Sequence, residues 1–452
     1  MEQVTNLGEV RKKRKRKKLL RAAAAIIFIL AVTYGAAAIM NHQDYMGPAS
    51  FFTMLQGGEG YPVEAPGGKS KGLYTAGGNL AVVNDTDLFL YNTKGSQIFN
   101  VKHHMANPLA KSAGNFLLMF DRGGKGYSLY NRVDPVADGK METPIYTGAV
   151  AQNGVFAIAT RGKDYLSQVT VYSRSSQEQY SWNYADKMAT NIALSPNGNK
   201  MAVAALYTQD GVLHSQLLLY NDGQLVETRD FEGEVVCHLL FTNDDTIVGI
   251  TDATAFSITS KGKLRGEFHY QGQGLSAFAA TEHTTVLLLG SYQQNGGYDL
   301  ISLTEDMLKE SSAKVQGTVH QICADDENAY ILAGNRFYQC NLKTGALKVE
   351  TLSDYVYDVI PLGRYVYAVT NEQITRTVKE DISQWQTAPQ NKDQEDNPEP
   401  EPPEENNQGA SPPPEGTKGE EPGNVPEEEN SEGSKEETPP PTEEKPQGVP
   451  GL

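Results

Sequence analysis

Residue types that could perform chemistry are few and scattered in this chain. Eight histidines occur among 452 residues, and only His103 and His104 are adjacent. The sequence has no HExxH or CxxC metal-ligand spacing and no GxSxG nucleophile motif. GGKG at 123–126 lacks the GxxxxGK[ST] frame of a phosphate-binding loop and lies between strand-like segments. We therefore expect no catalytic residue, no bound metal and no cofactor.

Three cysteines and two acidic loops complete the set of reactive side chains. Cys237, Cys323 and Cys340 fall on expected strands that are not direct neighbours, so we predict buried free thiols and no disulfide. The loops at 243–252 and 325–327 are acidic enough to suggest calcium. Hairpin turns favour the same residue types, and we interpret both loops as turns.

The elements that must position any site are β-strands. Residues 61–378 show almost no helical periodicity and alternate short apolar runs with Gly, Asn and Asp turns. One very apolar strand recurs at intervals of about 41 residues, which matches the roughly 40–45 residues of a four-stranded propeller blade. Its eight copies are LAVVND (80–85), FLLMFD (116–121), VFAIAT (155–160), MAVAAL (201–206), TIVGIT (246–251), TVLLLG (285–290), AYILAG (329–334) and YVYAVT (365–370).

This repeat predicts an all-β fold, a β-propeller of eight four-stranded blades within residues 61–380. A seven-bladed propeller is the alternative if two of the eight repeat units belong to a single blade. A strand covered by neighbours on both faces reads as a continuous apolar run, and blades that cannot bury their faces alone must stack into a closed ring. The last unit lacks an outer strand after Val378, and we predict that GYPVEA at 60–65 supplies it.

The motif SPNG at 195–198, followed by an apolar strand, resembles the SPDG turn of bacterial β-propellers of the TolB and WD40-like kind. The whole arrangement resembles uncharacterised single-pass envelope proteins of Gram-positive bacteria with a propeller ectodomain of unknown function. That resemblance implies a fold and a location, and no reaction. The GH and WD dipeptides of WD40 repeats are missing. With only Trp182 and Trp385, the repeated tryptophan motif of quinoprotein dehydrogenases is missing too.

The net charge of −17 is unevenly distributed. Residues 1–21 carry a net charge of +7, and the uncharged segment 22–40 is about 28 Å long as a helix, enough to cross a bilayer. The positive-inside rule places residues 1–21 in the cytoplasm, with a linker at 41–60 outside the cell membrane. A cleaved signal peptide is the alternative. The topology-determining cluster consists of Arg11, Lys12, Lys13, Arg14, Lys15, Arg16, Lys17, Lys18 and Arg21.

Residues 381–452 form the other charged end. Fifteen of the 23 prolines and 18 acidic residues lie in 389–452, which has no aromatic residue. Such a segment buries too little apolar area to offset its chain entropy, so we predict a disordered tail. The acidic balance also argues against a nucleic-acid partner.

The remaining candidate site is the central channel of the propeller, which the innermost strands line. We expect a membrane-anchored, extracytoplasmic, non-catalytic interaction or scaffold module whose partner is an envelope protein or a cell-wall polymer. The alternative is a ligand-binding sensor or an enzyme with its site at the channel mouth. Five polar residues on or near the inner strands are the candidate ligand contacts: Lys111, Asn191, His238, Gln321 and Asp358.

Overall fold

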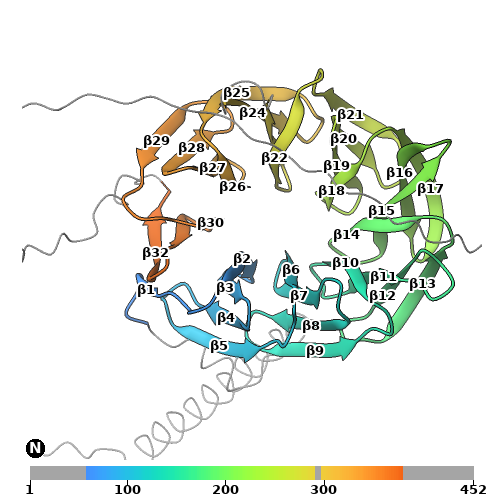
Figure 1. Cartoon of the computed structure of the whole chain (residues 1–452), viewed down its shortest axis with the longest axis horizontal. Helices are drawn as coiled ribbons and strands as arrows, with labels where there is room; N and C mark the ends of the chain where they lie inside the picture. Colours follow the sequence, from blue (N-terminus) through green and yellow to red (C-terminus); the bar gives the residue numbers. More distant parts are fainter. Residues whose placement is uncertain (1–57, 291–296, 380–452) are drawn as a thin grey trace, which may run out of the picture. The chain divides into compact units, whose positions relative to one another are not determined.

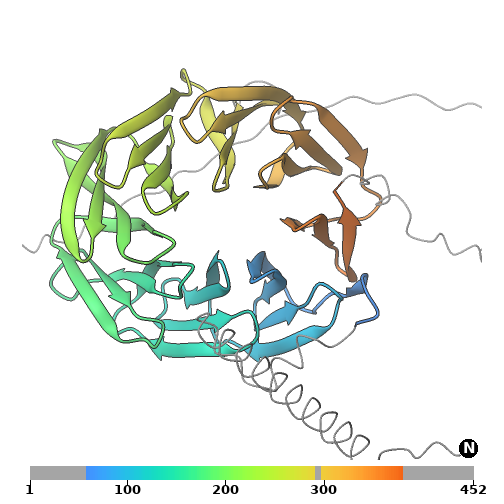
Figure 2. The same cartoon turned by 180° about the vertical axis from the view of Figure 1, so that it is seen from behind.

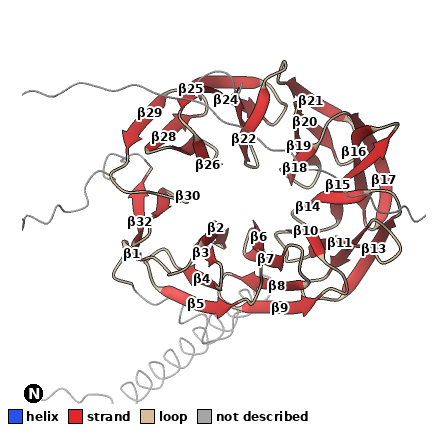
Figure 3. Ribbon diagram, in the orientation of Figure 1, coloured by secondary structure: helices blue, strands red, loops and turns tan. Residues whose placement is uncertain are grey.

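The computed structural model describes residues 58–290 and 297–379, and in these ranges the regular structure consists of β-strands alone (Figure 3). The strands form eight antiparallel four-stranded sheets, each a blade of one closed ring (Figure 1). The view from behind shows the same ring (Figure 2). The prediction of an eight-bladed propeller is confirmed, and the seven-bladed alternative is wrong.

Each blade is numbered along the chain, with its strands given from the channel outward. Blade 1 contains β2 (Ser70–Ala76), β3 (Asn79–Asn84), β4 (Asp87–Tyr91) and β5 (Gln97–Lys102). Blade 2 contains β6 (Pro108–Ala113), β7 (Phe116–Asp121), β8 (Gly126–Asn131) and β9 (Pro135–Lys140). Blade 3 contains β10 (Ile145–Val150), β11 (Phe156–Arg161), β12 (Ser167–Tyr172) and β13 (Glu178–Tyr184). Blade 4 contains β14 (Met188–Leu194), β15 (Lys200–Gln209), β16 (Val212–Asn221) and β17 (Gln224–Glu232).

The second half of the ring follows the same order. Blade 5 contains β18 (Val236–Phe241), β19 (Thr246–Thr251), β20 (Thr254–Thr259) and β21 (Leu264–His269). Blade 6 contains β22 (Gly274–Ala280), β23 (Thr284–Gly290), β24 (Gly297–Thr304) and β25 (Lys309–Gln316). Blade 7 contains β26 (Val319–Ala324), β27 (Asn328–Ala333), β28 (Arg336–Asn341) and β29 (Leu347–Thr351). Blade 8 contains β30 (Asp358–Leu362), β31 (Tyr365–Val369), β32 (Gln373–Val378) and β1 (Val63–Glu64).

The eight apolar runs of the sequence are the second strands of the blades. A second strand has a neighbouring blade on each side, so both of its faces are buried; Leu117 and Leu118 of β7 point to opposite sides and are both fully buried. Each of the eight junctions between successive blades encloses its own apolar cluster among the described residues. Outer strands are polar, and β17 is exposed along most of its length.

The ring closes through the N-terminal strand. β1 pairs antiparallel with β32, with Val63 opposite Ile374. The backbone N–H of Ala65 donates to the carbonyl of Glu372 at 2.9 Å. The ring of Tyr61 contacts Tyr367 edge-on, with 5.0 Å between centroids. The prediction that GYPVEA supplies the missing outer strand of the last blade is confirmed.

Six of the eight innermost strands contain a register shift, which adds one residue relative to the second strand. Such a bulge offsets the repeat by one position, so the inner strands cannot be aligned by spacing alone. The shifts lie between Ser70 and Gly72, Ile145 and Thr147, Ala189 and Asn191, Val236 and His238, Leu275 and Ala277, and Val319 and Gln321.

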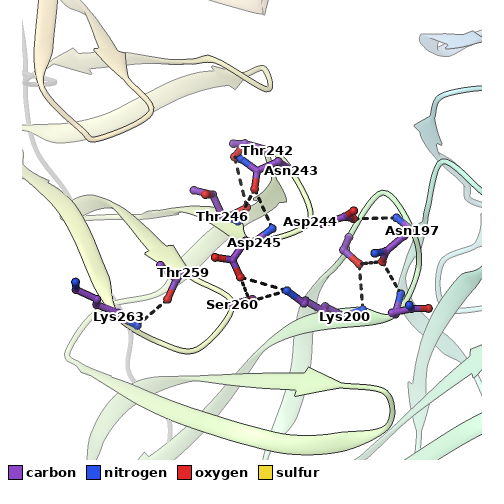
Figure 4. Close-up of polar contacts among 12 residues, drawn as sticks. Asn197, Lys200, Thr242, Asn243, Asp244, Asp245, Thr246, Thr259, Ser260 and Lys263 are labelled. Carbon is purple, nitrogen blue, oxygen red and sulfur yellow. Dashed lines mark hydrogen bonds and ion pairs between the residues drawn. The ribbon is translucent and has the colours of Figure 1, made fainter.

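The ring has two distinct faces. Face A carries the turns between first and second strands and between third and fourth strands, and face B carries the turns between second and third strands and the connections between blades. On face A the turns of blades 4 and 5 are joined by polar contacts (Figure 4). Lys200 Nζ donates to Asp245 Oδ1 at 3.2 Å and to Ser260 Oγ at 2.9 Å. The N–H of Asn197 donates to Asp244 Oδ1 at 3.1 Å.

Several predicted segments lie outside the described residues. They are the basic segment 1–21, the membrane-spanning segment 22–40, most of the linker 41–60 and the tail 381–452. Within 58–290 and 297–379 no helix has the length and apolar character needed to cross a membrane.

Candidate functional site

The five predicted channel residues all lie on innermost strands, on the side that faces the next blade along the chain. Successive residues of a strand point to opposite sides, so the residue next to a predicted channel residue points toward the preceding blade. Ala110, Leu239 and Val359 belong to the clusters that their blades form with the blade before. The side chains of four of them therefore enter the junctions between blades at the channel wall: Asn191, His238, Gln321 and Asp358. Lys111 lies on the same side of its strand but is exposed to the channel.

Two of these side chains use their amide groups to join neighbouring blades. Asn191 Nδ2 donates to the carbonyl of Cys237 at 2.9 Å, in the bulge of the next inner strand. Gln321 accepts from the N–H of Val359 at 2.7 Å and donates to the Val359 carbonyl at 2.9 Å. These bonds satisfy backbone groups that the bulges and strand ends leave unpaired. The side chains of Asn191 and Gln321 thus stabilise the contacts between neighbouring blades.

Asp358 lies where blades 7, 8 and 1 meet. Its carboxyl accepts from Gln321 Nε2 and from the backbone N–H of Leu73. Burial raises the pKa of Asp358 to about 7, and these hydrogen bonds offset only part of the rise. The same burial, with Asp358 nearby, raises the pKa of the Cys323 thiol well above its usual value. This corner of the channel wall therefore holds a carboxyl group that titrates near neutral pH.

Lys111 and His238 lie apart from this corner and line one cavity at the channel mouth on face A. The cavity has a volume of about 300 Å³ and is bounded by strands β6, β10, β14 and β18 and by the turns that follow them. Burial lowers the pKa of Lys111. Burial and the positive charge of Lys111 together lower the pKa of His238 to about 4, so its ring is neutral at pH 7.

The rim of this cavity includes two residues that sequence reasoning missed. Gln152 Nε2 donates to Glu282 Oε1 at 3.2 Å, which joins the inner turn of blade 3 to that of blade 6 across the channel mouth. Both lie in turns that the repeat predicted. Gln152 and Glu282 lie close together only because the ring closes, and nothing in the sequence around either residue indicates this contact.

A larger cavity, about 450 Å³ in volume, opens on face B at the edge of blades 2 and 3. One of its ion pairs joins Lys163 Nζ to Glu142 Oε2 at 2.5 Å, and both side chains are exposed. Exposed ion pairs of this kind contribute little free energy. Its charged lining residues are of both signs and exposed, and the cavity lies at the rim of the ring, away from the channel.

The other candidate residues have structural partners. His103 Nδ1 accepts from the N–H of Met105 at 3.1 Å, so its Nε2 carries the proton toward the carbonyl of Asn84, 3.1 Å away. His103 is buried and its neighbour His104 is exposed, with a φ of 53°. Asp325 pairs with Lys379 and accepts from the N–H of its own turn. Within 58–290 and 297–379 no group of acids, His and Cys could hold a metal ion.

The three cysteines are free thiols, as predicted. Cys340 is fully buried, whereas Cys237 and Cys323 are half-buried at the channel wall. Burial raises the pKa of each thiol, so all three are protonated at neutral pH and poorly nucleophilic. The geometry of the channel thus supports binding through Lys111 and His238 better than covalent catalysis.

Comparison with known proteins agrees with this fold. Residues 62–379 match a family described as "Family of unknown function (DUF5711)". No curated protein matches the chain. The C-terminal WD40 domain of Sif2 is 12% identical, covers 71% of this chain and 98% of its own, and superposes with a TM-score of 0.52.

Two further solved structures are similar at lower scores. The β-propeller domain of Cps50 (Swd1) from Myceliophteria thermophila is 13% identical, with coverage of 65% and 100% and a TM-score of 0.43. BamB from Moraxella catarrhalis is 12% identical, with coverage of 60% and 87% and a TM-score of 0.41. Of these three structures the Sif2 domain has a TM-score above 0.5, and at its identity the likeness extends to the fold alone.

Proposed function

The chain belongs to the family of unknown function DUF5711, and we propose that it is a membrane-anchored, extracytoplasmic interaction module of the bacterial cell envelope. The anchor rests on the basic cluster at 11–21 followed by the uncharged segment 22–40. The propeller contributes a rigid, closed surface. Its partner is an envelope protein or a cell-wall polymer that binds without being chemically changed.

The positions of the chain ends favour face B as the binding surface. The N–H of Gly60 donates to the Lys94 carbonyl at 3.1 Å, and the N–H of Lys379 donates to the Arg364 carbonyl at 3.2 Å. Lys94 and Arg364 lie in turns on face A, so the described chain enters and leaves on that face. A tether that continues from either end of the described chain would join the propeller on face A.

A projecting hairpin on face B carries this proposal. Strands β15 and β16 each have ten residues, whereas the second and third strands of the other blades have five to eight. A two-residue turn of Asp210 and Gly211, both with positive φ, ends the hairpin. Val212 and Leu213 beside the turn are 42% and 43% exposed. These two adjacent side chains form a small exposed apolar surface at the tip, and a partner that covers it removes apolar area from water.

Contacts along the stem hold the hairpin in place. The ring of Tyr207 stacks on His214 with 5.2 Å between centroids. Its hydroxyl donates to Asp230 Oδ1 at 3.0 Å, on the outer strand of the same blade. The tip therefore loses little conformational freedom on binding, which favours affinity.

Site-specific photocrosslinking in intact cells tests this proposal. A crosslinker at position 213 should capture one partner in stoichiometric amounts, and Leu213→Asp should abolish co-purification of that partner. Leu308 is the matched control, since it is apolar, 67% exposed and located on face A. Equal capture from positions 213 and 308, or no capture from 213, would contradict the hairpin as the binding site. Labelling of an introduced cysteine at 343 by a membrane-impermeant maleimide tests the location.

The second candidate function is a ligand-binding sensor or enzyme at the channel mouth. The observation that favours it is the cavity on face A that Lys111 and His238 line. A thermal-shift screen of the full-length protein tests it, because a ligand that binds only the native state raises the unfolding temperature. Stabilisation that is lost on Lys111→Met would support this function.

A further inference from the structure

The cavity at the channel mouth contains a cation that the described residues leave unpaired. Lys111 lies on β6 and its side chain is in contact with solvent inside the channel. Among residues 58–290 and 297–379, no hydrogen bond or ion pair engages its ammonium group. Because this ammonium group is exposed at the cavity wall, an anion that enters the cavity can form a charge-assisted hydrogen bond with it without breaking an existing contact.

His238 faces the same cavity from blade 5. Its ring packs against Phe278 with 5.3 Å between centroids, and no hydrogen bond to a described residue involves its nitrogens. In blades 4 and 7, Asn191 and Gln321 occupy the equivalent place after the bulge and are bonded to the next inner strand. The neutral imidazole of His238 is thus available to donate one hydrogen bond to a ligand.

The rest of the cavity wall is mostly apolar. Ile192, Leu240 and Phe241 line it together with small residues of β10. At the rim, Glu282 is held by Gln152 and adds a negative charge. An apolar wall favours a ligand with an apolar body, and the rim carboxylate disfavours a second negative charge on it. A volume of about 300 Å³ limits that ligand to a small molecule.

We propose that this cavity binds a small organic monocarboxylate. The carboxylate pairs with Lys111 and accepts from His238, and the apolar body packs against Ile192, Leu240 and Phe241. This inference rests on the second candidate function, a ligand site at the channel mouth, and it names the ligand class. It is independent of the hairpin on face B.

Titration calorimetry of the full-length protein in detergent tests the proposal with three probes. The probes are benzoate, its uncharged isostere benzamide, and inorganic phosphate. Benzoate should bind at least about tenfold more tightly than benzamide, because only benzoate can form a charge pair with Lys111; tenfold corresponds to about 1.4 kcal/mol. Lys111→Met should reduce benzoate affinity by a similar factor and leave benzamide unaffected, whereas Lys111→Arg should retain binding.

The matched control is Lys102→Met, because Lys102 is exposed on outer strand β5, far from the channel. Melting curves without ligand check that each variant is folded. Equal affinity for benzoate and benzamide would overturn the monocarboxylate and leave a ligand site of another class. Preference for phosphate over benzoate would do the same. No binding of any probe to a folded protein would overturn the inference, and crosslinking from position 213 would still test the interaction module.

Discussion

Replacing Asp358 by asparagine should stabilise the ring at alkaline pH and have no effect in acid. Asp358 is 8% exposed at the junction of blades 7, 8 and 1. Burial raises its pKa to about 7 from an ordinary value of 3.8, although hydrogen bonds from Gln321 and Leu73 oppose the rise. Between these two pH values the native state holds a proton that the unfolded chain has released.

The sign and size of the effect follow from proton linkage. The pKa is higher in the native state, so the stabilising contribution of this carboxyl group is complete below about pH 4 and is lost as the pH rises toward 7. A rise of about three pKa units corresponds to about 4 kcal/mol at 1.36 kcal/mol per unit. Asparagine has the same shape, still accepts hydrogen bonds through Oδ1 and does not ionise. Above neutral pH, Asp358→Asn should therefore raise the free energy of unfolding by up to this amount.

Urea unfolding of the full-length protein at about pH 4 and about pH 8 measures this difference. Asp354→Asn is the control, because Asp354 is exposed four residues earlier in the chain. A gain for Asp358→Asn that is confined to the higher pH supports the reasoning. The reasoning is wrong if the variant is less stable than the native protein at pH 8, or if its gain is the same at both pH values.

Four further outcomes follow from the fold. Deleting residues 58–66 removes the closing strand β1 and should lower the unfolding temperature by several degrees in scanning calorimetry; an unchanged melting curve would contradict closure. Gln321→Leu should cost about 1–3 kcal/mol in urea unfolding, because it leaves backbone groups of blade 8 unpaired. Gly249→Ala should cost about 1–3 kcal/mol, because the added Cβ meets the ring of Phe256. The thiol of Cys340, whose pKa burial raises to about 11, should react with iodoacetamide only after unfolding, as mass spectrometry would detect.

The fold could be predicted from the sequence because the strongest signals are local. A second strand covered on both sides is apolar at every position, as FLLMFD at 116–121 is, and each copy stands out without reference to its partners. The closing strand was predictable for two reasons. The last repeat unit lacked its outer strand, and a strand-like segment preceded the first repeat unit. Both inferences needed only the spacing of the repeat.

The candidate site was less predictable, since its geometry depends on contacts between blades. The bulges in six inner strands change which side a residue faces, and sequence spacing does not report them. Asn191 and Gln321 look like binding residues in the sequence, yet their amides join the blades. The contact of Gln152 with Glu282 spans residues 130 positions apart and exists only in the closed ring.

Residue type alone therefore does not separate structural from functional polar groups in this channel. Asn191, Gln321 and Asp358 all have partners on the next blade, so a ligand would have to break existing hydrogen bonds to reach them. A ligand that approaches Lys111 or His238 replaces only water, and so pays no such cost. Since the free energy of binding is a difference between bound and free states, the unpaired groups are the ones on which a ligand can gain most. This difference is why we place the proposed carboxylate contacts on blades 2 and 5, whereas the polar residues of blades 7, 8 and 1 join those blades in the closed ring.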